Sequence, residues 1–246
     1  MVSYTTSHSP DTVTLRQSKV VTPQHNSHLH IKKRMLKATI LLGTLKPSSG
    51  KEFSNTKVLC EILRDELTKQ NVATDIVRLV DYKILPGLKS NMGRGDEWPK
   101  ILKRLIASDI IIFATPIWWG GHSSLIQRVF ERMDELNDEI VATGKSELLN
   151  KVGGMVITGA EDGAQHVIAG LANFMIWNGL TLPPACSLSY LGGHKATTAQ
   201  GLKKEFLKRS YTVGMAKTMA RNLAYFAALL KENPLPVQEK DSQAFR

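Results

Sequence analysis

Residues 110–121 read Ile-Ile-Ile-Phe-Ala-Thr-Pro-Ile-Trp-Trp-Gly-Gly, and this stretch decides the fold class. The uncharged apolar run 110–114 is typical of a strand that is buried on both faces, as in a parallel sheet. The proline at position 116 ends the run, because it removes a backbone donor and fixes φ. Two tryptophans and two glycines follow, where an α/β sheet opens its binding crevice at the carboxyl ends of its strands. The two aromatic side chains either border a planar ligand or fill the core.

Apolar periodicity predicts strands and helices that alternate from residue 38 onward. The predicted strands are 38–42, 74–79, 110–114, 152–158 and, more weakly, 185–190. The predicted helices are 55–69, 96–107, one that begins at Ser123 or Ser124 and reaches Leu136, 167–178, and a long one over 198–231 in which Gly214 is the candidate interruption. Five strands that alternate with helices require right-handed crossovers, and hence a doubly wound sheet with helices on both faces.

The loop after the first strand distinguishes the two common strand orders. No Gly-x-Gly-x-x-Gly motif follows residues 38–42, which removes the main support for a dinucleotide-type Rossmann fold. We therefore predict an α/β, flavodoxin-like three-layer sandwich. Its five-stranded parallel sheet has the order 2-1-3-4-5, with the ligand at the junction of strands one and three.

Composition bounds the class of protein. The chain has 246 residues, of which 42% are hydrophobic and 22% charged, as is ordinary for a soluble globular protein. Cys60 and Cys186 lie far apart and make no metal-ligand spacing, which favours a reducing compartment and predicts no metal site. There is no apolar run of about 18 residues, so we expect no membrane span.

The formal net charge of +10 is unevenly distributed. Residues 1–37 contain six Lys or Arg and one Asp, so half of the net charge lies there and the rest of the chain is only mildly basic. A mildly basic body suits an anionic cofactor. The sequence shows no helix-turn-helix, zinc-finger or RNA-recognition motif, and we predict no nucleic-acid partner.

The predicted domains are a disordered N-terminal extension over 1–35, a flavodoxin-like domain over 36–232 and a flexible C-terminal tail over 233–246. The extension is rich in Ser, Thr, His and Lys and has no periodicity, so it cannot bury enough apolar surface to offset its ordering entropy. Its histidines at 25, 28 and 30 are interpreted as part of a polar tail rather than as a metal site. Met35 leaves open that the chain starts there.

The loop after the first strand, residues 43–56, is rich in hydroxyl side chains and leads into a helix. Unpaired N–H groups and the helix dipole make that position favourable for a phosphate. Ser54 serves there either as a simple helix cap or as part of the phosphate site. The two glycines of the loop are seven residues apart rather than five, and Glu52 stands where Ser or Thr would hold magnesium, which excludes a nucleotide-hydrolysing P-loop. Residues 121–125 do not form Gly-x-Ser-x-Gly, so no serine hydrolase is predicted.

The loop after the fourth strand, residues 158–166, contains two glycines four apart, which let the main chain approach a ligand closely. Asp162 is interpreted either as a turn former or as a functional residue, and His166 either as a residue that starts a helix or as a functional one. The two interpretations are equally supported by the sequence. Three loops then lie at one edge of the sheet: a phosphate site, an aromatic wall and a glycine turn. Together they predict a slot for a planar phosphorylated ligand, and FMN fits it best.

These pieces resemble the NADPH-dependent FMN reductase branch of the flavodoxin-like superfamily over about residues 36–192. The matching pieces are Gly43-Thr44-Leu45-Lys46-Pro47-Ser48 with Ser54-Asn55-Thr56, Ala114-Thr115-Pro116-Ile117-Trp118-Trp119-Gly120, and Glu161-Asp162-Gly163-Ala164 with His166-Val167-Ile168. The resemblance implies that the first loop holds the FMN phosphate, that 116–121 border the isoalloxazine and that 158–163 contact the ring edge. The implied cofactor-binding residues are Thr44, Lys46, Ser54, Asn55, Thr56, Pro116, Ile117, Trp118, Trp119, Gly120, Gly121, Thr158, Gly159, Glu161, Asp162 and Gly163.

The resemblance also implies an activity: an FMN-dependent NAD(P)H oxidoreductase that passes a hydride from NADPH or NADH through FMN to a small acceptor. In such an enzyme the protein supplies positioning and electronic tuning, so we name no catalytic side chain; His122 and His166 are candidates for tuning or proton supply. The resemblance further implies a homodimer or homotetramer, and we expect a cytoplasmic location. Two rivals stay open: a flavodoxin-type electron carrier and a cofactor-free flavodoxin-like interaction protein. The mildly basic body favours the enzyme, because carriers usually show an acidic face.

Overall fold

The computed structural model describes residues 35–160 and 162–236. The predicted extension up to residue 34, with its three histidines, and the last ten residues of the predicted tail lie outside the described residues. Glu161, one of the implied cofactor-binding residues, also lies outside them.

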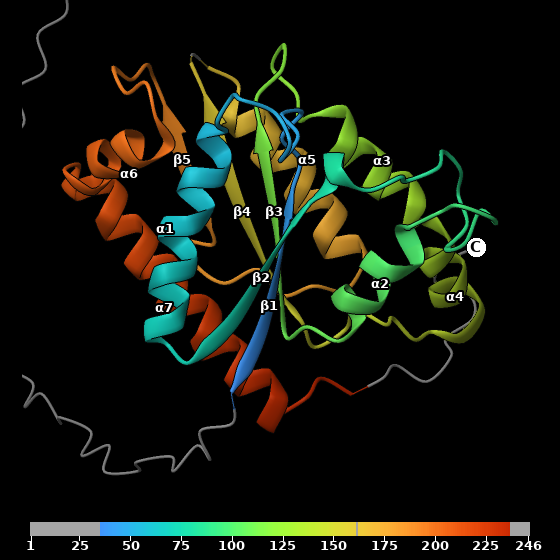
Figure 1. The fold of residues 1–246 in the computed structure, drawn as a ribbon. Helices are drawn as coiled ribbons and strands as arrows, with labels where there is room; N and C mark the ends of the chain where they lie inside the picture. Colours follow the sequence, from blue (N-terminus) through green and yellow to red (C-terminus); the bar gives the residue numbers. More distant parts are fainter. Residues whose placement is uncertain (1–34, 161, 237–246) are drawn as a thin grey trace, which may run out of the picture. The chain divides into compact units, whose positions relative to one another are not determined.

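Five parallel strands form one sheet in the order β2-β1-β3-β4-β5 (Figure 1). The strands are β1 (Leu36–Leu42), β2 (Val72–Arg78), β3 (Ile110–Pro116), β4 (Val152–Gly159) and β5 (Ser187–Leu191). In the centre, Ile112 of β3 pairs with Ile40 of β1 and with Gly154 of β4. The predicted fold class and strand order are therefore confirmed.

Helices cover both faces of the sheet (Figure 1). One layer contains α1 (Asn55–Lys69), α6 (Ala199–Leu207) and α7 (Ser210–Glu232), and the other contains α2 (Trp98–Ile106), α3 (Ser124–Arg132), α4 (Asp134–Thr143) and α5 (Ala164–Trp177). Ile112 of β3 packs into the first layer, and Ile111 and Phe113 pack into the second. Residues 110–114 of β3 are apolar because both faces of the strand are covered.

Two helical stretches differ from their prediction, because each is divided. The stretch over 198–231 forms α6 and α7, and the break lies at Arg209 rather than at Gly214, which is inside α7. Arg209 has an extended backbone (φ −89°, ψ 102°), and its guanidinium lies 4.9 Å from the centre of the Tyr190 ring. This cation–π contact joins the break to the end of β5. The helix expected to reach Leu136 is likewise divided at Met133 into α3 and α4.

The second and fifth strands also differ slightly from the sequence prediction. Strand β2 begins two residues earlier than predicted, and Leu79 opens a short 3-10 helix, η1 (Leu79–Asp81). The fifth strand begins at Ser187 rather than at residue 185, since Ala185 has φ +54°. A positive φ of this size belongs to the left-handed region and is incompatible with an extended strand.

An ion pair inside the second layer fixes the segment that precedes α2. The side chains of Arg132 and Asp96 are 0% exposed, and their Nη2 and Oδ2 atoms are 2.7 Å apart. Burial alone would raise the pKa of Asp96. Hydrogen bonds from Arg132 and from the backbone N–H groups of Met92, Trp98 and Leu85 outweigh it and lower this pKa to about 2. Asp96 accepts the Trp98 N–H at 3.2 Å, but α2 begins at Trp98 with Glu97 as its N-cap, two residues later than predicted.

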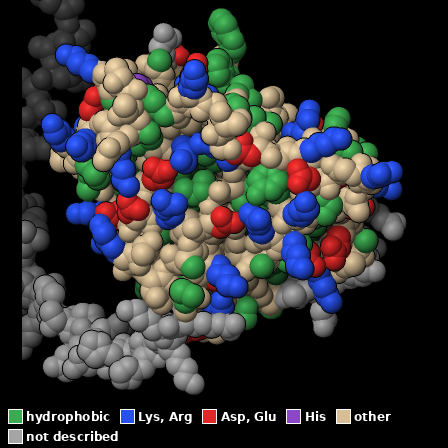
Figure 2. Space-filling view, in the orientation of Figure 1, with side chains coloured by type: hydrophobic (Ala, Val, Ile, Leu, Met, Phe, Trp, Pro, Cys, Tyr) green, Lys and Arg blue, Asp and Glu red, His purple; other side chains and the backbone are tan. Residues whose placement is uncertain are grey.

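The surface seen in Figure 2 carries Lys and Arg side chains spread over the whole face, with Asp and Glu between them. Across residues 35–160 and 162–236, no helix has the length and apolar character that crossing a bilayer requires.

Candidate functional site

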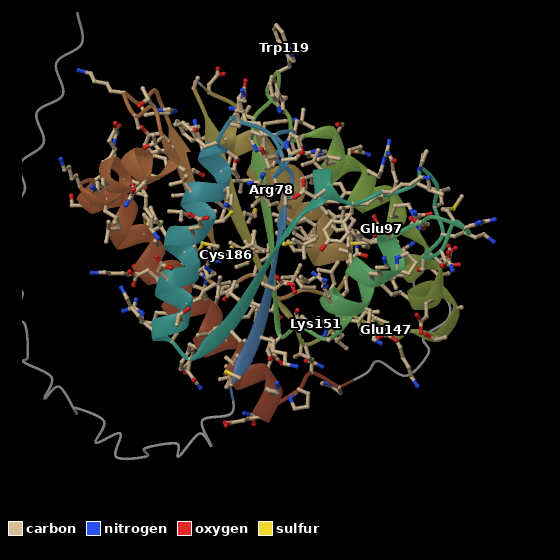
Figure 3. All side chains as sticks on the ribbon, viewed as in Figure 1. Arg78, Glu97, Trp119, Glu147, Lys151 and Cys186 are labelled. Carbon is tan, nitrogen blue, oxygen red and sulfur yellow. The ribbon has the colours of Figure 1, made fainter. Side chains whose placement is uncertain are left out.

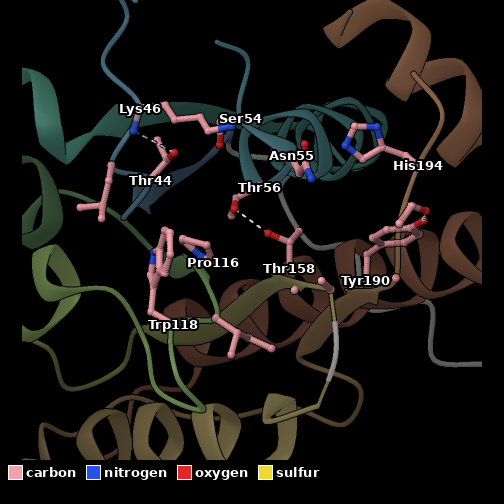
Figure 4. A pocket seen from close by; sticks show the side chains of 16 residues that line it. Thr44, Lys46, Ser54, Asn55, Thr56, Pro116, Trp118, Thr158, Tyr190 and His194 are labelled. Carbon is pink, nitrogen blue, oxygen red and sulfur yellow. Dashed lines mark hydrogen bonds between the residues drawn. The ribbon is translucent and has the colours of Figure 1, made fainter. Parts of the chain in front are cut away.

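A cavity of about 440 Å³ lies where loops from the carboxyl ends of four strands converge. Its wall contains residues from the loops after β1, β3, β4 and β5, namely Thr44, Leu45, Lys46, Ser54, Asn55, Thr56, Pro116, Ile117, Trp118, Thr158, Gly159, Ala160, Tyr190, Gly192, Gly193 and His194 (Figure 4). This is the position at which open α/β sheets bind ligands. Ten of the implied cofactor-binding residues are brought together here.

The N-terminus of α1 forms one end of the cavity. Ser54 is buried, and its Oγ accepts the Lys57 N–H at 3.2 Å, so the capping interpretation is confirmed. Ser54 nevertheless lines the cavity, so capping and a ligand contact are compatible. Asn55 and Thr56 open the helix, where backbone N–H groups have no acceptor within the helix. The first turn contains no acidic side chain, so the helix dipole leaves this end of the cavity attractive to an anion.

Lys46 and Thr44 close the loop after β1 around this end. The Thr44 hydroxyl is buried and accepts the Lys46 N–H at 3.3 Å. The Lys46 ammonium donates to the carbonyl of Phe53 at 3.2 Å and pairs with Glu52 at 3.2 Å. Lys46 therefore joins the two ends of the loop and brings a positive charge to the cavity wall, partly compensated by the exposed carboxylate.

Two threonine hydroxyls meet on the floor of the cavity. The Oγ1 atoms of Thr56, on α1, and Thr158, on β4, are 2.6 Å apart (Figure 4). Both residues are buried, at 2% and 4% exposure. This contact links the helix N-terminus to the strand whose following loop was predicted to contact the ring edge.

The loop after β3 forms a tight hairpin beside the cavity. Ile117 donates its N–H to the carbonyl of Thr158 at 2.8 Å, which extends the β3–β4 pairing past the proline. Trp118 and Gly121 exchange two backbone hydrogen bonds of 2.8 and 2.9 Å around Trp119 and Gly120, whose φ values are +50° and +78°. Positive φ at both central residues is the signature of a type I′ turn. Trp118 is half exposed and borders the cavity.

Trp119 lies at the tip of this hairpin and is fully exposed. Figure 3 shows it projecting beyond the strand ends, at the opposite end of the sheet from Lys151. Trp119 and its two following glycines are not part of the cavity wall.

The loop after β4 reaches the cavity with Gly159 and Ala160, while its second glycine contacts the hairpin. Gly163 has φ +93°, and a Cβ atom placed on it would lie 3.0 Å from the Cα of Gly120. The absence of a side chain at position 163 therefore lets the two loops touch. Asp162 and Gly163 lie outside the cavity wall.

The segment after β5 completes the cavity, and sequence reasoning missed it. Tyr190 is buried and donates its hydroxyl to the carbonyl of Gly193 at 2.8 Å, which holds the turn against the cavity. The Nδ1 atom of His194 lies 3.0 Å from the carbonyl oxygen of Ala196. A carbonyl only accepts, so Nδ1 carries the proton, and the other ring nitrogen is turned toward Asn55 (Figure 4). The one available signal was position, because this segment follows a strand of the same sheet.

The two candidate histidines lie outside the cavity wall. His122 packs edge-on against Phe130 at 5.1 Å, and its Nδ1 is 3.2 Å from the carbonyl oxygen of Ser123. His166 is exposed on α5, near the start of that helix, as predicted. Ser123 occupies the N-cap position of α3, but its hydroxyl makes no capping bond, and its N–H donates instead to Thr115 Oγ1 at 2.9 Å.

The donor set fits a flavin phosphate. None of the described residues in the cavity wall is Asp, Glu or Cys, while hydroxyls, one amide, one lysine and a helix N-terminus contribute to it. Such neutral and positive donors suit a phosphate. Pro116, Ile117 and Trp118 supply an apolar wall that matches a planar ring. Among the described residues, no group of three metal-ligating side chains occurs.

A flavodoxin-like sheet with this site defines the class of a flavin-binding α/β protein. The model of one family, NADPH-dependent FMN reductase, matches residues 36–192, and the chain belongs to that family. Family membership supports a flavin-dependent oxidoreductase.

Three similar proteins are informative. The chain is 31% identical over 214 residues to 8-demethyl-8-aminoriboflavin-5'-phosphate synthase of Streptomyces davaonensis, and the match covers 81% of this chain and 80% of that protein. A crystal structure of RosB with bound 8-demethyl-8-formylriboflavin-5'-phosphate superposes with a TM-score of 0.67 at 29% identity, and the match covers 81% of this chain and 82% of that one. The chain is also 29% identical over 206 residues to the divalent metal cation transporter MntH of Mycobacterium bovis. There the match covers 80% of this chain but only 29% of that protein's length.

Proposed function

We propose that this protein is an FMN-dependent oxidoreductase that takes a hydride from NADPH or NADH and passes it to a small acceptor. The observation that carries the proposal is the cavity itself, which combines the α1 N-terminus with an apolar wall. The family supports the flavin, and the choice of pyridine nucleotide and acceptor is part of the proposal.

The proposed cofactor contacts follow from the geometry of the wall. Thr44, Ser54, Asn55 and Thr56 would hold the phosphate by hydroxyl, amide and backbone donors, with Lys46 supplying charge. The segment 116–118 would border the isoalloxazine ring. Bound FMN supplies the hydride chemistry, and the chain positions the ring and excludes water on the buried side. Among the described residues of the wall, the side chains that can exchange a proton with a ligand are Lys46, Tyr190 and His194.

One anaerobic titration tests the proposal against both rivals. The purified chain is saturated with FMN and mixed with NADPH or NADH while the flavin absorbance is followed. Bleaching by a pyridine nucleotide supports the enzyme. A yellow protein that neither nucleotide bleaches indicates an electron carrier. A chain that takes up no FMN indicates the cofactor-free interaction protein.

A second candidate function is chemistry on the flavin itself. The Streptomyces davaonensis relative is named as a synthase of a modified riboflavin phosphate, and RosB holds a related formyl compound. Mass spectrometry of the flavin released after turnover separates the two candidates. An unchanged FMN mass supports a cofactor, and a changed mass supports a substrate.

We further propose a homodimer or homotetramer in the cytoplasm. Large exposed apolar side chains, including Trp119 and Trp177, support self-association. Cys60 and Cys186 are both free thiols, which supports a reducing compartment. Light scattering coupled to size-exclusion chromatography, with and without FMN, tests the oligomeric state, and a monomer under both conditions contradicts it.

A further inference from the structure

We infer that Thr158 is a positioning residue that acts through Thr56 to strengthen the binding of a phosphate monoester. The inference rests on the proposed function, because it takes the FMN phosphate to lie at the N-terminus of α1. It assigns to Thr158 a role that differs from the ring-edge contact expected of its loop.

The geometry isolates the two hydroxyls as a pair. Their oxygen atoms are 2.6 Å apart, and within the described residues neither hydroxyl has another hydrogen-bond partner. Both side chains belong to the cavity wall. Thr158 is held by the sheet, because its carbonyl accepts the Ile117 N–H at 2.8 Å and its residue pairs with Pro116 and Tyr190. A β-branched side chain on such a strand has little rotamer freedom, so its hydroxyl is held in place.

Proton counting sets the direction of the hydrogen bond once a phosphate is bound. The Thr56 hydroxyl has one proton, and an anionic phosphate oxygen is a stronger acceptor than a threonine hydroxyl. The Thr56 proton therefore goes to the phosphate, and Thr56 Oγ1 then accepts the proton of Thr158. The chain runs from Thr158 O–H to Thr56 Oγ1 and from Thr56 O–H to the phosphate. Consecutive hydrogen bonds of this kind polarise and strengthen each other.

The same arrangement explains why a hydroxyl is placed at the end of β4. Without it, Thr56 Oγ1 would be left buried with an unsatisfied lone pair when its proton is turned toward the phosphate, and such a group is costly. Thr158 thus lowers the free energy of the complex with a phosphate-bearing ligand. It does not stabilise the complex with a ligand that lacks a phosphate.

A double-mutant cycle tests the inference. The full-length chain, freed of flavin, is titrated with FMN and with riboflavin for the wild type, Thr56→Val, Thr158→Val and the double variant. Valine is close to threonine in shape, so each change removes a hydroxyl with little change in volume. We expect Thr158→Val to weaken FMN binding about tenfold, because the buried Thr56 oxygen loses its donor, and to change riboflavin binding less than about twofold. In the Thr56→Val background, the Thr158→Val change should have no further effect on FMN binding.

Two additional variants keep the test decisive. Thr158→Ser retains the hydroxyl and should restore FMN binding to within about threefold of the wild type. Thr158→Ala removes the hydroxyl with a different packing change and should show the same ratio of FMN to riboflavin affinity as Thr158→Val. Riboflavin binding by each variant verifies that its cavity is folded.

The outcomes separate this inference from the proposed function. Equal affinity of the wild-type chain for FMN and riboflavin overturns the phosphate site, and with it the proposed function. A wild type that prefers FMN, combined with additive effects of the two valine changes or an equal loss of riboflavin binding, overturns the role of Thr158 alone.

Discussion

Replacing Asp96 by Asn should destabilise the protein in a pH-dependent way. The carboxylate and the Arg132 guanidinium are both 0% exposed, and the pKa of Asp96 is lowered from 3.8 to about 2. A lowered pKa contributes stability that is present above the unfolded value and is lost as the pH falls toward the folded value. At 1.36 kcal/mol per unit, this contribution is about 2.4 kcal/mol at pH 7 and about 1.3 kcal/mol at pH 3.

The assay is urea unfolding of the flavin-free chain at pH 7 and at pH 3, because a bound ligand would add its own stabilisation. We expect Asp96→Asn to lower the free energy of unfolding by at least about 2.4 kcal/mol at pH 7, since it leaves the buried Arg132 without a counter-charge. The gap between wild type and variant should shrink by about 1.1 kcal/mol at pH 3.

A surface pair provides the matched control. Asp75 and Arg104 are 3.0 Å apart, but about half of each side chain is exposed, so Asp75→Asn should cost less than about 1 kcal/mol at both pH values. The reasoning is refuted if the gap for Asp96→Asn is the same at pH 7 and pH 3, or if it is no larger than the gap for Asp75→Asn.

Three further predictions concern the cavity and its hairpin. Ser54→Asp keeps an N-cap but places a negative charge against the phosphate, so FMN affinity should fall about 30- to 100-fold in a binding titration while Ser54→Asn stays within about threefold. Trp119→Asn should raise the free energy of unfolding by about 0.5–1 kcal/mol, because Asn tolerates φ +50° better than Trp. Gly120→Ala should lower it by about 1 kcal/mol. Urea unfolding that shows a loss for Trp119→Asn and a gain for Gly120→Ala would contradict the turn assignment. His194→Ala should weaken FMN binding about two- to tenfold and His166→Ala should leave it unchanged, and equal effects of the two would remove His194 from the site.

The fold could be predicted because its signals are local. The apolar run of β3 and the apolar faces of the helices reflect burial at each position, and the absence of a dinucleotide-binding motif selected the strand order. The divisions of the helices were missed because they depend on distant contacts. The break at Arg209 coincides with its contact to the ring of Tyr190, nineteen positions earlier in the sequence. Periodicity in a window of residues carries no information about such a contact.

The end of the cavity at the N-terminus of α1 could also be predicted, for a related reason. A helix N-terminus has free N–H groups wherever it occurs, so Ser54, Asn55 and Thr56 could be assigned from the helix boundary alone. The glycines were harder to interpret. Gly120 and Gly163 are predicted to contact the cofactor, and in the structure they also lie against each other across 43 positions of sequence. A glycine indicates that something approaches closely, without indicating whether it is a ligand or another loop.

The part of the wall after β5 shows how topology extends a sequence motif. Tyr190, Gly192, Gly193 and His194 form no motif that indicates a ligand, yet they line the cavity. They do so because β5 is parallel to the other strands, and its carboxyl end reaches the same edge of the sheet. Topology likewise brings Thr56 and Thr158 into hydrogen-bond contact, although the sequence assigned their segments to different parts of the ligand. A test of the coupling between them therefore examines whether the phosphate end and the ring end of the cavity act as one site.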